Sequence, residues 1–568
     1  MKLIIKSLVI IILFEILSYG CANPISPTGG IKDTIPPTLL ESNPVDQQLN
    51  FEGQTITLWF DEIISADKIT SNLVITPTTE TKYKTVQKKY SVSLQFEEPF
   101  DDSTTYTFNF FDGITDITEK NPAENLILAF STGNYIDSLY LSGQVIDLLT
   151  GEPQDKITVG LYNITDSLDF QTTKPTYFST TDKSGNFYLQ NIKASNFRMF
   201  AFGDENRNLI FDAATESYAI YSDTLNMRLV SGDTVNLSSI KIDASELNFI
   251  SARPSGLYFD LRYSKPITSY QYHNSDSVKL ATKLIDENKT IRVYDNKSFT
   301  DSLFSIFYVR DSLGNQSSDS TYIKFRESSR KPEQYNLTLQ PGKGSQVTSD
   351  TRYTIEFNKP SFLIVDDFLD VVYDTLLRFN YQPSFIKYDK HNNSISFSLN
   401  IDNQSLTDSL NSIINSIQID TTNIDSVSLA LKNKLSTIPT SSFNIEILPK
   451  SFVSVELDSS TTITNGYKFL KTESQGVIRV NMVTDSTHYL VQVMNKSEAV
   501  QTMSNCTQCV FNNLNPGKYW IRVLIDSNKN GIWDIGNYRE NIAPEPVIYF
   551  KEETTLRANF DNSLEYSF

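Results

Sequence analysis

Two short polar loops carry side-chain oxygens at a spacing that suits a metal ion. The oxygens recur at offsets of 0, 2, 4 and 8 residues, at Asp204, Asn206, Asn208 and Asp212 and again at Asp526, Asn528, Asn530 and Asp534. Calcium binds about six to eight oxygens, which carboxylates, amide side chains and main-chain carbonyls supply. Because alternate residues of a tight loop can turn their oxygens toward one point, the pattern predicts structural calcium in these loops, with Ile532 as a main-chain position.

Neither loop is a complete EF-hand. The twelfth position, where an EF-hand carries a bidentate glutamate, is Thr215 in the first loop and Asn537 in the second. Gly531 fills the sixth position of the second loop, whereas Leu209 fills it in the first. Asx-rich loops also close strands with their own hydrogen bonds and hold no ion. Both interpretations stay open, and calcium is favoured more in the second loop.

Cys506 and Cys509 form the short motif C-T-Q-C. A thioredoxin-like redox motif would lie at a helix N-terminus in a βαβ unit, and this pair lies between two strand-like runs. A zinc knuckle would need two further ligands nearby, which the sequence lacks. The remaining alternatives are a local disulfide and two free thiols, and an oxidising compartment favours the disulfide.

The rest of the chain offers little for catalysis. The histidines His273, His391 and His488 lie in different segments without metal-ligand spacing. The adjacent carboxylates Asp61-Glu62 and Asp366-Asp367 would point to opposite faces of a strand, so neither pair can act together in glycoside hydrolysis. No nucleophile elbow, H-E-x-x-H motif or phosphate-binding loop is present. We therefore expect a non-enzymatic protein.

Composition narrows the class of protein further. The chain has 568 residues, a formal net charge of −18 and 39% hydrophobic residues, including 29 Tyr and 35 Phe. This hydrophobic content favours folded domains, and the recurring short β-prone runs predict an all-β chain of tandem β-sandwiches. No basic cluster stands out, so we expect no nucleic-acid binding.

The N-terminus predicts export and a lipid anchor. Lys2 and Lys6 precede an apolar run over residues 8–17, which is typical of a secretory signal peptide, predicted over 1–20. Gly20-Cys21 resembles the cleavage site of bacterial lipoproteins, although Ser18 replaces the usual Leu or Val. The alternative is an ordinary signal peptide with a chance cysteine. Lipidation of Cys21, for example with palmitate, would anchor the protein to a membrane, and residues 21–37, rich in Pro, Gly and Ser, would form a tether.

The first folded segment, 38–134, shows strand periodicity. Ile56, Leu58 and Phe60 alternate with polar or bulky residues, as in a half-buried strand. The stretches SNPVDQQLNFEGQTITLWFDEII, DDSTTYTFNF and FSTG resemble, in order and spacing, the bacterial Ig-like domains of surface proteins. This resemblance implies a fold and not an activity.

The chain then repeats itself. LSGQVIDLLTGEPQDKITVGLY and the DKSGN turn resemble prealbumin-like modules, including adhesin B-type domains whose D-x-N-x-N-G-x-x-D loops bind calcium. Asn191 precedes Asp204 by the same 13 residues that separate Asn513 from Asp526. This repeat predicts prealbumin-like sandwiches at 135–245 and 450–568. The equal intervals of 16 residues from Pro44 to Phe60 and from Pro341 to Phe357 predict a second Ig-like domain at 331–449, and strand-like runs predict a sandwich of unclear type at 246–330.

One segment has helical spacing. In the region 401–435, apolar residues recur at Leu406, Leu410, Ile413, Ile414 and Ile417. We expect a short helical insertion in the second Ig-like domain. It either caps its own sandwich, which is favoured, or docks a partner.

The whole chain resembles the Ig-like-domain outer-membrane lipoproteins of Bacteroidetes-type bacteria. The resemblance rests on CANPISPTGGIKDTIPP joined to the Ig-like start and on both polar loops. It implies a non-catalytic scaffold or interaction subunit in the cell envelope, with a protein partner such as an outer-membrane β-barrel or its assembly or secretion machinery. The alternative is a surface adhesin or glycan-binding protein. The membrane face stays open.

Overall fold

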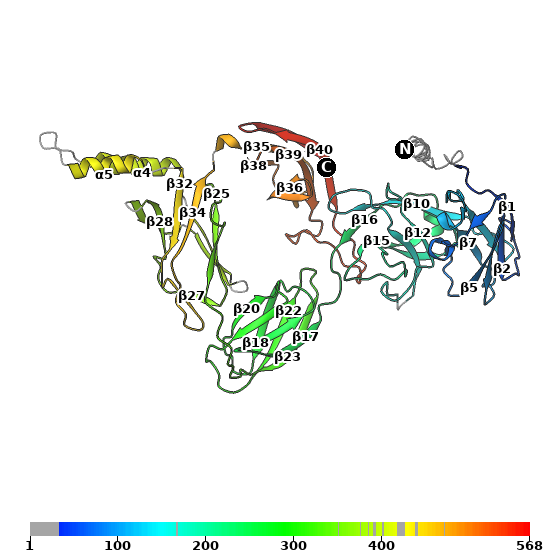
Figure 1. Cartoon of the computed structure of the whole chain (residues 1–568), viewed down its shortest axis with the longest axis horizontal. Coiled ribbons are helices and arrows are strands. Elements are labelled where there is room, and N and C mark those ends of the chain that lie inside the picture. Colours follow the sequence, from blue (N-terminus) through cyan, green and yellow to red (C-terminus); the bar gives the residue numbers. More distant parts are fainter. Residues whose placement is uncertain are drawn as a thin grey trace, which may run out of the picture. The chain divides into compact units, whose positions relative to one another are not determined.

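The computed structural model describes residues 33–165, 168–349, 351–374, 377–383, 385–389, 393–399, 401, 403–416, 426–437, 441–470 and 472–568. The predicted signal peptide, the lipidation site Cys21 and most of the tether lie outside these residues, as do His391 and Ile417. The predicted fold class is confirmed, because nearly all of the regular structure is β-strand (Figure 1). In the described part of the chain, no helix is both long enough and apolar enough to cross a membrane.

The 38–134 module is a β-sandwich around one core. One sheet has the order β1-β2-β6-β5, formed by Leu39–Asn43, Thr55–Phe60, Ser91–Phe96 and Tyr83–Lys88. The other has the order β4-β7-β9, formed by Val74–Thr76, Thr105–Asn109 and Ile127–Ser131. A small ribbon pairs β3 (Ile64–Ser65) with β8 (Thr115–Asp116), and the short helices are α2 (Ile69–Asn72) and η1 (Phe111–Gly113).

The predicted alternation explains how this sandwich packs. Ile56, Leu58 and Phe60 are all buried, and they share one apolar cluster with Phe108 and Phe130 of the opposite sheet. The rings of Phe108 and Phe130 stack with their centroids 5.7 Å apart. Aromatic side chains bury large areas, so this cluster accounts for much of the hydrophobic stabilisation of the module.

The 135–245 module contains a seven-stranded sheet of order β12-β11-β14-β15-β16-β10-β13. Its strands are β10 (Leu139–Asp147), β11 (Thr158–Asn163), β12 (Tyr177–Thr180), β13 (Asn186–Ile192), β14 (Asn196–Phe202), β15 (Ser217–Asn226) and β16 (Leu237–Lys241), with a short helix α3 (Met227–Val230). The predicted turn before β13 is present. Gly185 has a φ of 76°, and Asp182 Oδ1 accepts the N–H groups of Ser184 and Asn186 at 2.8 and 2.9 Å.

The 246–330 segment is a sandwich of two sheets. One has the order β17-β18-β21-β20 and the other β19-β22-β23. The strands are β17 (Phe249–Ser255), β18 (Tyr258–Tyr263), β19 (Ser269–Asn274), β20 (Ala281–Ile285), β21 (Thr290–Tyr294), β22 (Leu303–Arg310) and β23 (Gln316–Ile323). Lys265 of this segment is buried. Its Nζ lies 2.9 Å from Asp311 Oδ2 and donates hydrogen bonds to the main-chain carbonyls of Asp243 and Ser245, which directly precede the segment.

The 331–449 module repeats the sheet plan of the 38–134 module. Its first sheet, β24-β26-β31-β30, is formed by Leu337–Gln340, Arg352–Phe357, Ser394–Ser398 and Phe385–Asp389. Its second sheet has the order β25-β34-β32-β28-β29. β34 (Ile463–Phe469) lies beyond the predicted end of the module at residue 449, so this sandwich extends to Phe469; the other strands are Gln346–Val347, Ser442–Ile447, Leu369–Asp374 and Leu377–Asn380. A ribbon pairs β27 (Ser361–Leu363) with β33 (Phe452–Ser454).

The predicted helical insertion in this module consists of two helices, α4 (Asn403–Ser416) and α5 (Ser426–Ser436), drawn in yellow in Figure 1. Leu410 of α4 and Leu435 of α5 are buried together and pack with Tyr373 and Phe379, which belong to β28 and β29. The base of the insertion therefore packs on its own sandwich.

The 450–568 module has two sheets, β38-β35-β41 and β37-β36-β39-β40. The strands are β35 (Gly476–Val483), β36 (Tyr489–Asn495), β37 (Glu498–Ser504), β38 (Gln508–Leu514), β39 (Gly517–Ile525), β40 (Val547–Leu556) and β41 (Asp561–Ser567), and η2 (Thr472–Ser474) precedes them. β36 lies between β37 and β39 as β11 lies between β12 and β14. Asn191 and Asn513, which the internal repeat aligns, have φ angles of 56° and 58°.

The chain divides into two compact units. The first comprises residues up to Val145, Pro153–Ile210 and Asp223–Leu237, and the second comprises Ile146–Glu152, Phe211–Ser222 and Ser238–Phe568. Contacts with the last module explain why the two short segments Ile146–Glu152 and Phe211–Ser222 belong to the second unit. Lys551 Nζ lies 2.9 Å from Glu152 Oε1, and the Tyr538 ring packs edge-on to Phe211 at 5.2 Å.

Candidate functional site: the paired polar loops

The two predicted polar loops follow equivalent strands. The first begins at Asp204, just after β14 ends at Phe202, and the second begins at Asp526, directly after β39 ends at Ile525. Both loops therefore leave the sheet at the end of the strand that the internal repeat aligns. Burial raises the pKa of the Tyr162 hydroxyl on neighbouring β11, and the Asp204 carboxylate raises it further.

The second loop is closed by hydrogen bonds from its own main chain. Asp526 Oδ1 accepts the N–H of Asn530 at 3.1 Å, and Asp526 Oδ2 accepts the N–H of Gly531 at 2.9 Å. Asn528 Oδ1 also accepts the N–H of Asn530, and Asn530 Oδ1 accepts the N–H of Ile532, both at 2.9 Å. Short polar side chains that bond to the main chain two residues on form Asx turns.

The first loop repeats this network position by position. Asp204 accepts the N–H groups of Asn208 and Leu209 at 3.0 and 3.1 Å. Asn206 Oδ1 accepts the N–H of Asn208 at 2.9 Å, and Asn208 Oδ1 accepts the N–H of Ile210 at 2.7 Å. The spacing at offsets of 0, 2 and 4 thus has a structural role in both copies.

The two loops differ at their last predicted ligand. Asp534 Oδ2 accepts the side-chain amides of Asn528 and Asn530 at 2.6 and 2.7 Å, so these side chains of the second loop converge. Asp212 instead holds the turn that follows it, accepting the N–H of Ala214 and the hydroxyl of Thr215, both at 2.9 Å.

Sequence reasoning missed a glutamate in each loop. Glu545 is buried, and its Oε1 accepts the N–H groups of Ser527 and Asn528 at 2.7 and 3.0 Å. Its Oε2 accepts the N–H of Asp534 at 2.9 Å. In the first loop the buried Glu216 accepts the N–H of Asp212 at 2.8 Å. Glu216 stands one residue beyond the twelfth EF-hand position, but Glu545 lies so far along the chain that no spacing rule indicates it.

The second loop fits calcium better than the first. The Asp534 carboxylate meets the side-chain amides of Asn528 and Asn530, while the Asp526 carboxylate accepts main-chain N–H groups of the same loop, and oxygens of these types are calcium ligands. An amide rotated by half a turn would present its oxygen instead of its nitrogen. Ile532 would contribute only its main-chain carbonyl, because its side chain carries no oxygen. In the first loop Asp212 faces another turn, so the predicted ligands do not converge.

Other chemistry-bearing residues stay separate. Over the described parts of the chain, no group of three or more His, Cys, Asp or Glu residues is arranged to hold a metal ion. Cys506 and Cys509 form a disulfide, with Cys509 fully buried in the core of the 450–568 module. The disulfide closes the turn before β38 and leaves no thiol there for redox or metal chemistry.

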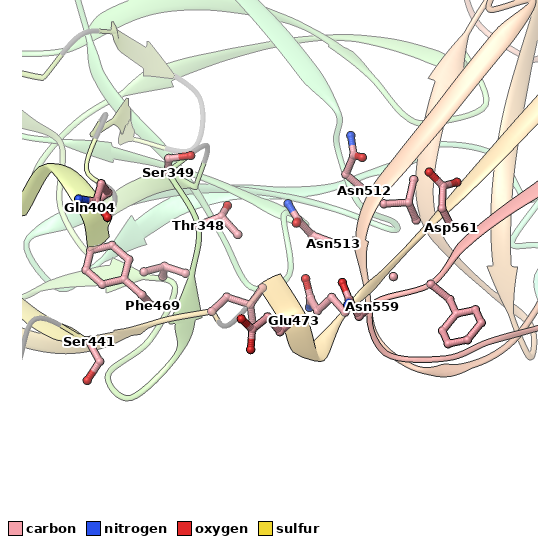
Figure 2. A pocket seen from close by; sticks show the side chains of 16 residues that line it. Thr348, Ser349, Gln404, Ser441, Phe469, Glu473, Asn512, Asn513, Asn559 and Asp561 are labelled. Carbon is pink, nitrogen blue, oxygen red and sulfur yellow. The ribbon is translucent and has the colours of Figure 1, made fainter.

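A hollow of about 1030 Å³ lies between the end of β34 and the start of β35 (Figure 2). Hydroxyl and amide side chains dominate its lining, including Thr348, Asn512 and Asn559. Its two carboxylates are Glu473 and Asp561, and Asp561 is paired with Arg479 at 2.8 Å. No histidine, cysteine or lysine is among the described residues that line it.

The comparison with protein families identifies the first module. Residues 33–132 match the family of bacterial Ig-like domains. This match confirms the Ig-like part of the resemblance seen in the sequence, and we call these residues the Ig-like domain from here on. No curated protein matches the chain.

Solved structures that resemble the chain do so weakly. A surface layer protein, SbsC domains 1–6, is 9% identical with a TM-score of 0.15, and the match covers 92% of this chain and 66% of that one. The L,D-transpeptidase LdtMt1 in complex with imipenem is 12% identical with a TM-score of 0.14, over 22% of this chain and 55% of that one. An L,D-transpeptidase from Mycobacterium smegmatis is 13% identical with a TM-score of 0.14, over 36% of this chain and 90% of that one. TM-scores this low carry no functional argument, and they do not establish catalysis.

Proposed function

We propose that this chain is a non-enzymatic scaffold or interaction subunit of the bacterial cell envelope. The observation that carries the proposal is a series of β-sandwich modules whose polar loops use their side chains to hold their own main chain. Residues 33–132 support it, because bacterial Ig-like domains are non-catalytic. Each sandwich presents edge strands and loops to a partner at positions that are fixed within its own module.

A lipid at Cys21 would anchor this scaffold to the outer membrane. The apolar run before Cys21 and the Pro- and Gly-rich residues after it support the anchor. In cells, Cys21→Ser should move the protein from the membrane fraction to the soluble fraction, and labelled palmitate should no longer be incorporated. Unchanged membrane association without label would count against a lipid anchor.

The partner we propose is an envelope protein, such as an outer-membrane β-barrel or a component of its assembly or secretion machinery. An affinity tag at the C-terminus, after Phe568, allows the protein to be purified from detergent-solubilised membranes. We expect one outer-membrane protein to copurify in a fixed molar ratio. A matched control lacks residues 472–568, which leaves β33 and β34 of the preceding sandwich in place, and tests whether the last module takes part in the contact.

A second candidate function is glycan binding, as in a surface adhesin. One observation favours it. Tyr308 and Tyr322 are 45% and 65% exposed on the sheet β19-β22-β23, and Phe304 packs against Tyr322 with ring centroids 5.1 Å apart. Exposed aromatic rings can stack on sugar rings. Retention of this protein on immobilised envelope glycans, and its loss in Tyr308→Ala/Tyr322→Ala, would favour the adhesin over the scaffold.

For the second polar loop we propose a structural calcium ion of the low affinity typical of extracellular modules, with Kd on the order of 10⁻⁴–10⁻³ M. An ion there would stiffen the end of β39 and would take no part in a reaction. Calcium at about ten times this Kd should raise the melting temperature of the last module, because a ligand that binds only the folded state stabilises it. Equal melting temperatures with calcium and with chelator would leave the loop as a hydrogen-bonded turn.

A further inference from the structure

The Ig-like domain has a strongly uneven charge distribution. Residues 33–132 contain 16 acidic residues but only six lysines and no arginine. Four of these lysines, Lys82, Lys84, Lys88 and Lys89, fall within eight residues of one another. Because the whole chain has a net charge of −18, its composition hides this cluster. We call these four residues the lysine edge.

The fold places the lysine edge on an unpaired strand. β5 pairs with β6 on one side only and ends the sheet β1-β2-β6-β5. Side chains alternate between the two faces of a strand. Tyr83 turns inward and packs against the core, so Lys82, Lys84 and Lys88 share the outer face. All four lysines are exposed, and none forms an ion pair within the described part of the chain.

The turn that follows β5 is held in place by its main chain. The carbonyl of Lys89 accepts the N–H of Ile64 at 3.0 Å, and that of Tyr90 accepts the N–H of Phe60 at 2.8 Å. Gln87 also donates to the carbonyl of Ile64 at 2.8 Å. The side chains of Lys89 and Tyr90 therefore project from a fixed turn. The Tyr90 ring is 50% exposed, and tyrosine is a residue type enriched at membrane–water interfaces.

The chain enters the domain at the same end of the sheet as this turn. Leu39, the first residue of β1, pairs with Phe60, while Trp59 pairs with Ser91 and Ser91 with Lys88. Twelve peptide units separate Asp33 from Cys21. Twelve residues of chain span at most about 40 Å. A lipid at Cys21 would hold the turn close to the membrane.

Acidic groups at this end restrict how the domain can approach the surface. Asp61 accepts the N–H of Thr38 at 2.8 Å on the β1 side. Partial desolvation raises the pKa of the neighbouring Glu62, and repulsion from Asp116, Asp33 and Asp61 raises it further. An anionic surface would repel these carboxylates and attract the lysines, so β5 and its turn would face that surface.

We propose that the lysine edge docks on the anionic phospholipid headgroups of the membrane that carries the lipid anchor. The proposal rests on the anchor at Cys21 for its geometry. Each lysine near an anionic surface contributes about a five-fold factor in affinity, and salt screens the attraction. Lysines on an edge strand also prevent pairing with other sheets. That role explains their charge but explains neither the exposed Tyr90 nor the position of the turn beside the chain entry.

The test uses the full chain carrying Cys21→Ser, so that no acyl group contributes to binding. The probes are vesicles of phosphatidylglycerol with phosphatidylcholine, and vesicles of phosphatidylcholine alone. We expect cosedimentation with the anionic vesicles only, weakening as salt is added. Replacing all four lysines of the edge by Gln should weaken binding by about 600-fold at low salt, and by less as salt is added, whereas replacing them by Arg should preserve it.

A matched control carries Lys183→Gln, Lys343→Gln, Lys450→Gln and Lys496→Gln, which remove the same charge from exposed sites elsewhere. Binding of this control should equal that of the parent chain. Equal loss of binding in both Gln variants would overturn the proposal. It would also be overturned if the Gln variant of the lysine edge bound anionic vesicles as tightly as the parent chain and differed from it only in self-association. Binding to an anionic polysaccharide but not to anionic vesicles would overturn it too. Failure of Cys21 lipidation in cells is a separate result, because this assay contains no lipidated protein.

Discussion

Leu209 and Gly531 occupy the same position of two copies of one loop, and both have a positive φ, 60° and 90°. Arg207 and Lys529, two residues earlier, also match, at 58° and 61°. The two loops thus share a main-chain path although only the second has glycine at the position where a side chain is disfavoured. The path is imposed by the aspartate and asparagine side chains that bond to it, which the two loops have in common.

Adding a side chain at position 531 should destabilise the last module. Gly531→Ala should cost about 1 kcal/mol of unfolding free energy, because a Cβ there meets no atom within 4 Å and only the positive φ opposes it. Gly531→Asn should cost less, because asparagine tolerates this conformation. Gly342→Ala, at a similarly open glycine without a positive φ, is the control and should be nearly neutral. Calorimetry of the full chain resolves the effect, and equal shifts for the two alanine variants would contradict it.

Removing Glu545 should loosen the second loop. Glu545→Ala leaves the N–H groups of Ser527, Asn528 and Asp534 without their carboxylate, at a cost of about 2–4 kcal/mol. Glu545→Gln keeps one acceptor oxygen and should cost less. The exposed Glu565 on β41 provides the control, and Glu565→Ala should change the unfolding free energy by less than about 0.5 kcal/mol. A similar loss for both alanine variants would refute this role.

The Ig-like domain should lose stability in acid through Asp116. Burial raises the pKa of this carboxyl, but the N–H groups of Glu119, Lys120 and Asn121 lower it more, so the pKa lies below its usual value. Because this carboxyl has a lower pKa in the folded domain than in the unfolded chain, it stabilises the domain at pH values above the unfolded pKa of about 3.9. The contribution disappears as the pH falls through the folded pKa. Asp116→Asn should lower the melting temperature at pH 7 and flatten its decline below about pH 4. If the melting temperature of Asp116→Asn declined below about pH 4 as that of the parent chain does, groups other than Asp116 would control the acid sensitivity of the domain.

The Cys506–Cys509 disulfide should stabilise the last module only modestly. It closes a loop with a sequence separation of 3, so the chain-entropy contribution is about 2 kcal/mol. Cys506→Ala/Cys509→Ala should lower the melting temperature of this module and leave the Ig-like domain unchanged. Calorimetric scans with and without reductant test this, since reductant should act on the parent chain but not on the double variant. A drop in every module would contradict a local role.

The sheets were predictable where one face of a strand is buried. Ile56, Leu58 and Phe60 alternate with more exposed residues, and this periodicity determines both the strand and the face that packs. The repeated interval before Asp204 and Asp526 likewise predicted that both loops follow matching strands. Patterns of this kind can be predicted from the sequence because they involve residues that are close to one another along the chain.

Contacts between distant residues could not be predicted. Glu545 reaches back 18 residues to Ser527, and β41 pairs in parallel with β35 from Val477↔Asp561 to Val483↔Ser567. No periodicity or spacing indicates such pairings. The lysine edge was overlooked for a different reason: four lysines in an acidic chain form a basic surface only once β5 is known to be an edge strand.

The central claim, a scaffold with an envelope protein partner, is tested most directly by the molar ratio of proteins purified with the tagged, lipidated chain from detergent-solubilised membranes. We predict one outer-membrane protein, such as a β-barrel, in a constant ratio that survives gel filtration. Purification of the chain alone, or with envelope glycan and no protein, would contradict the claim.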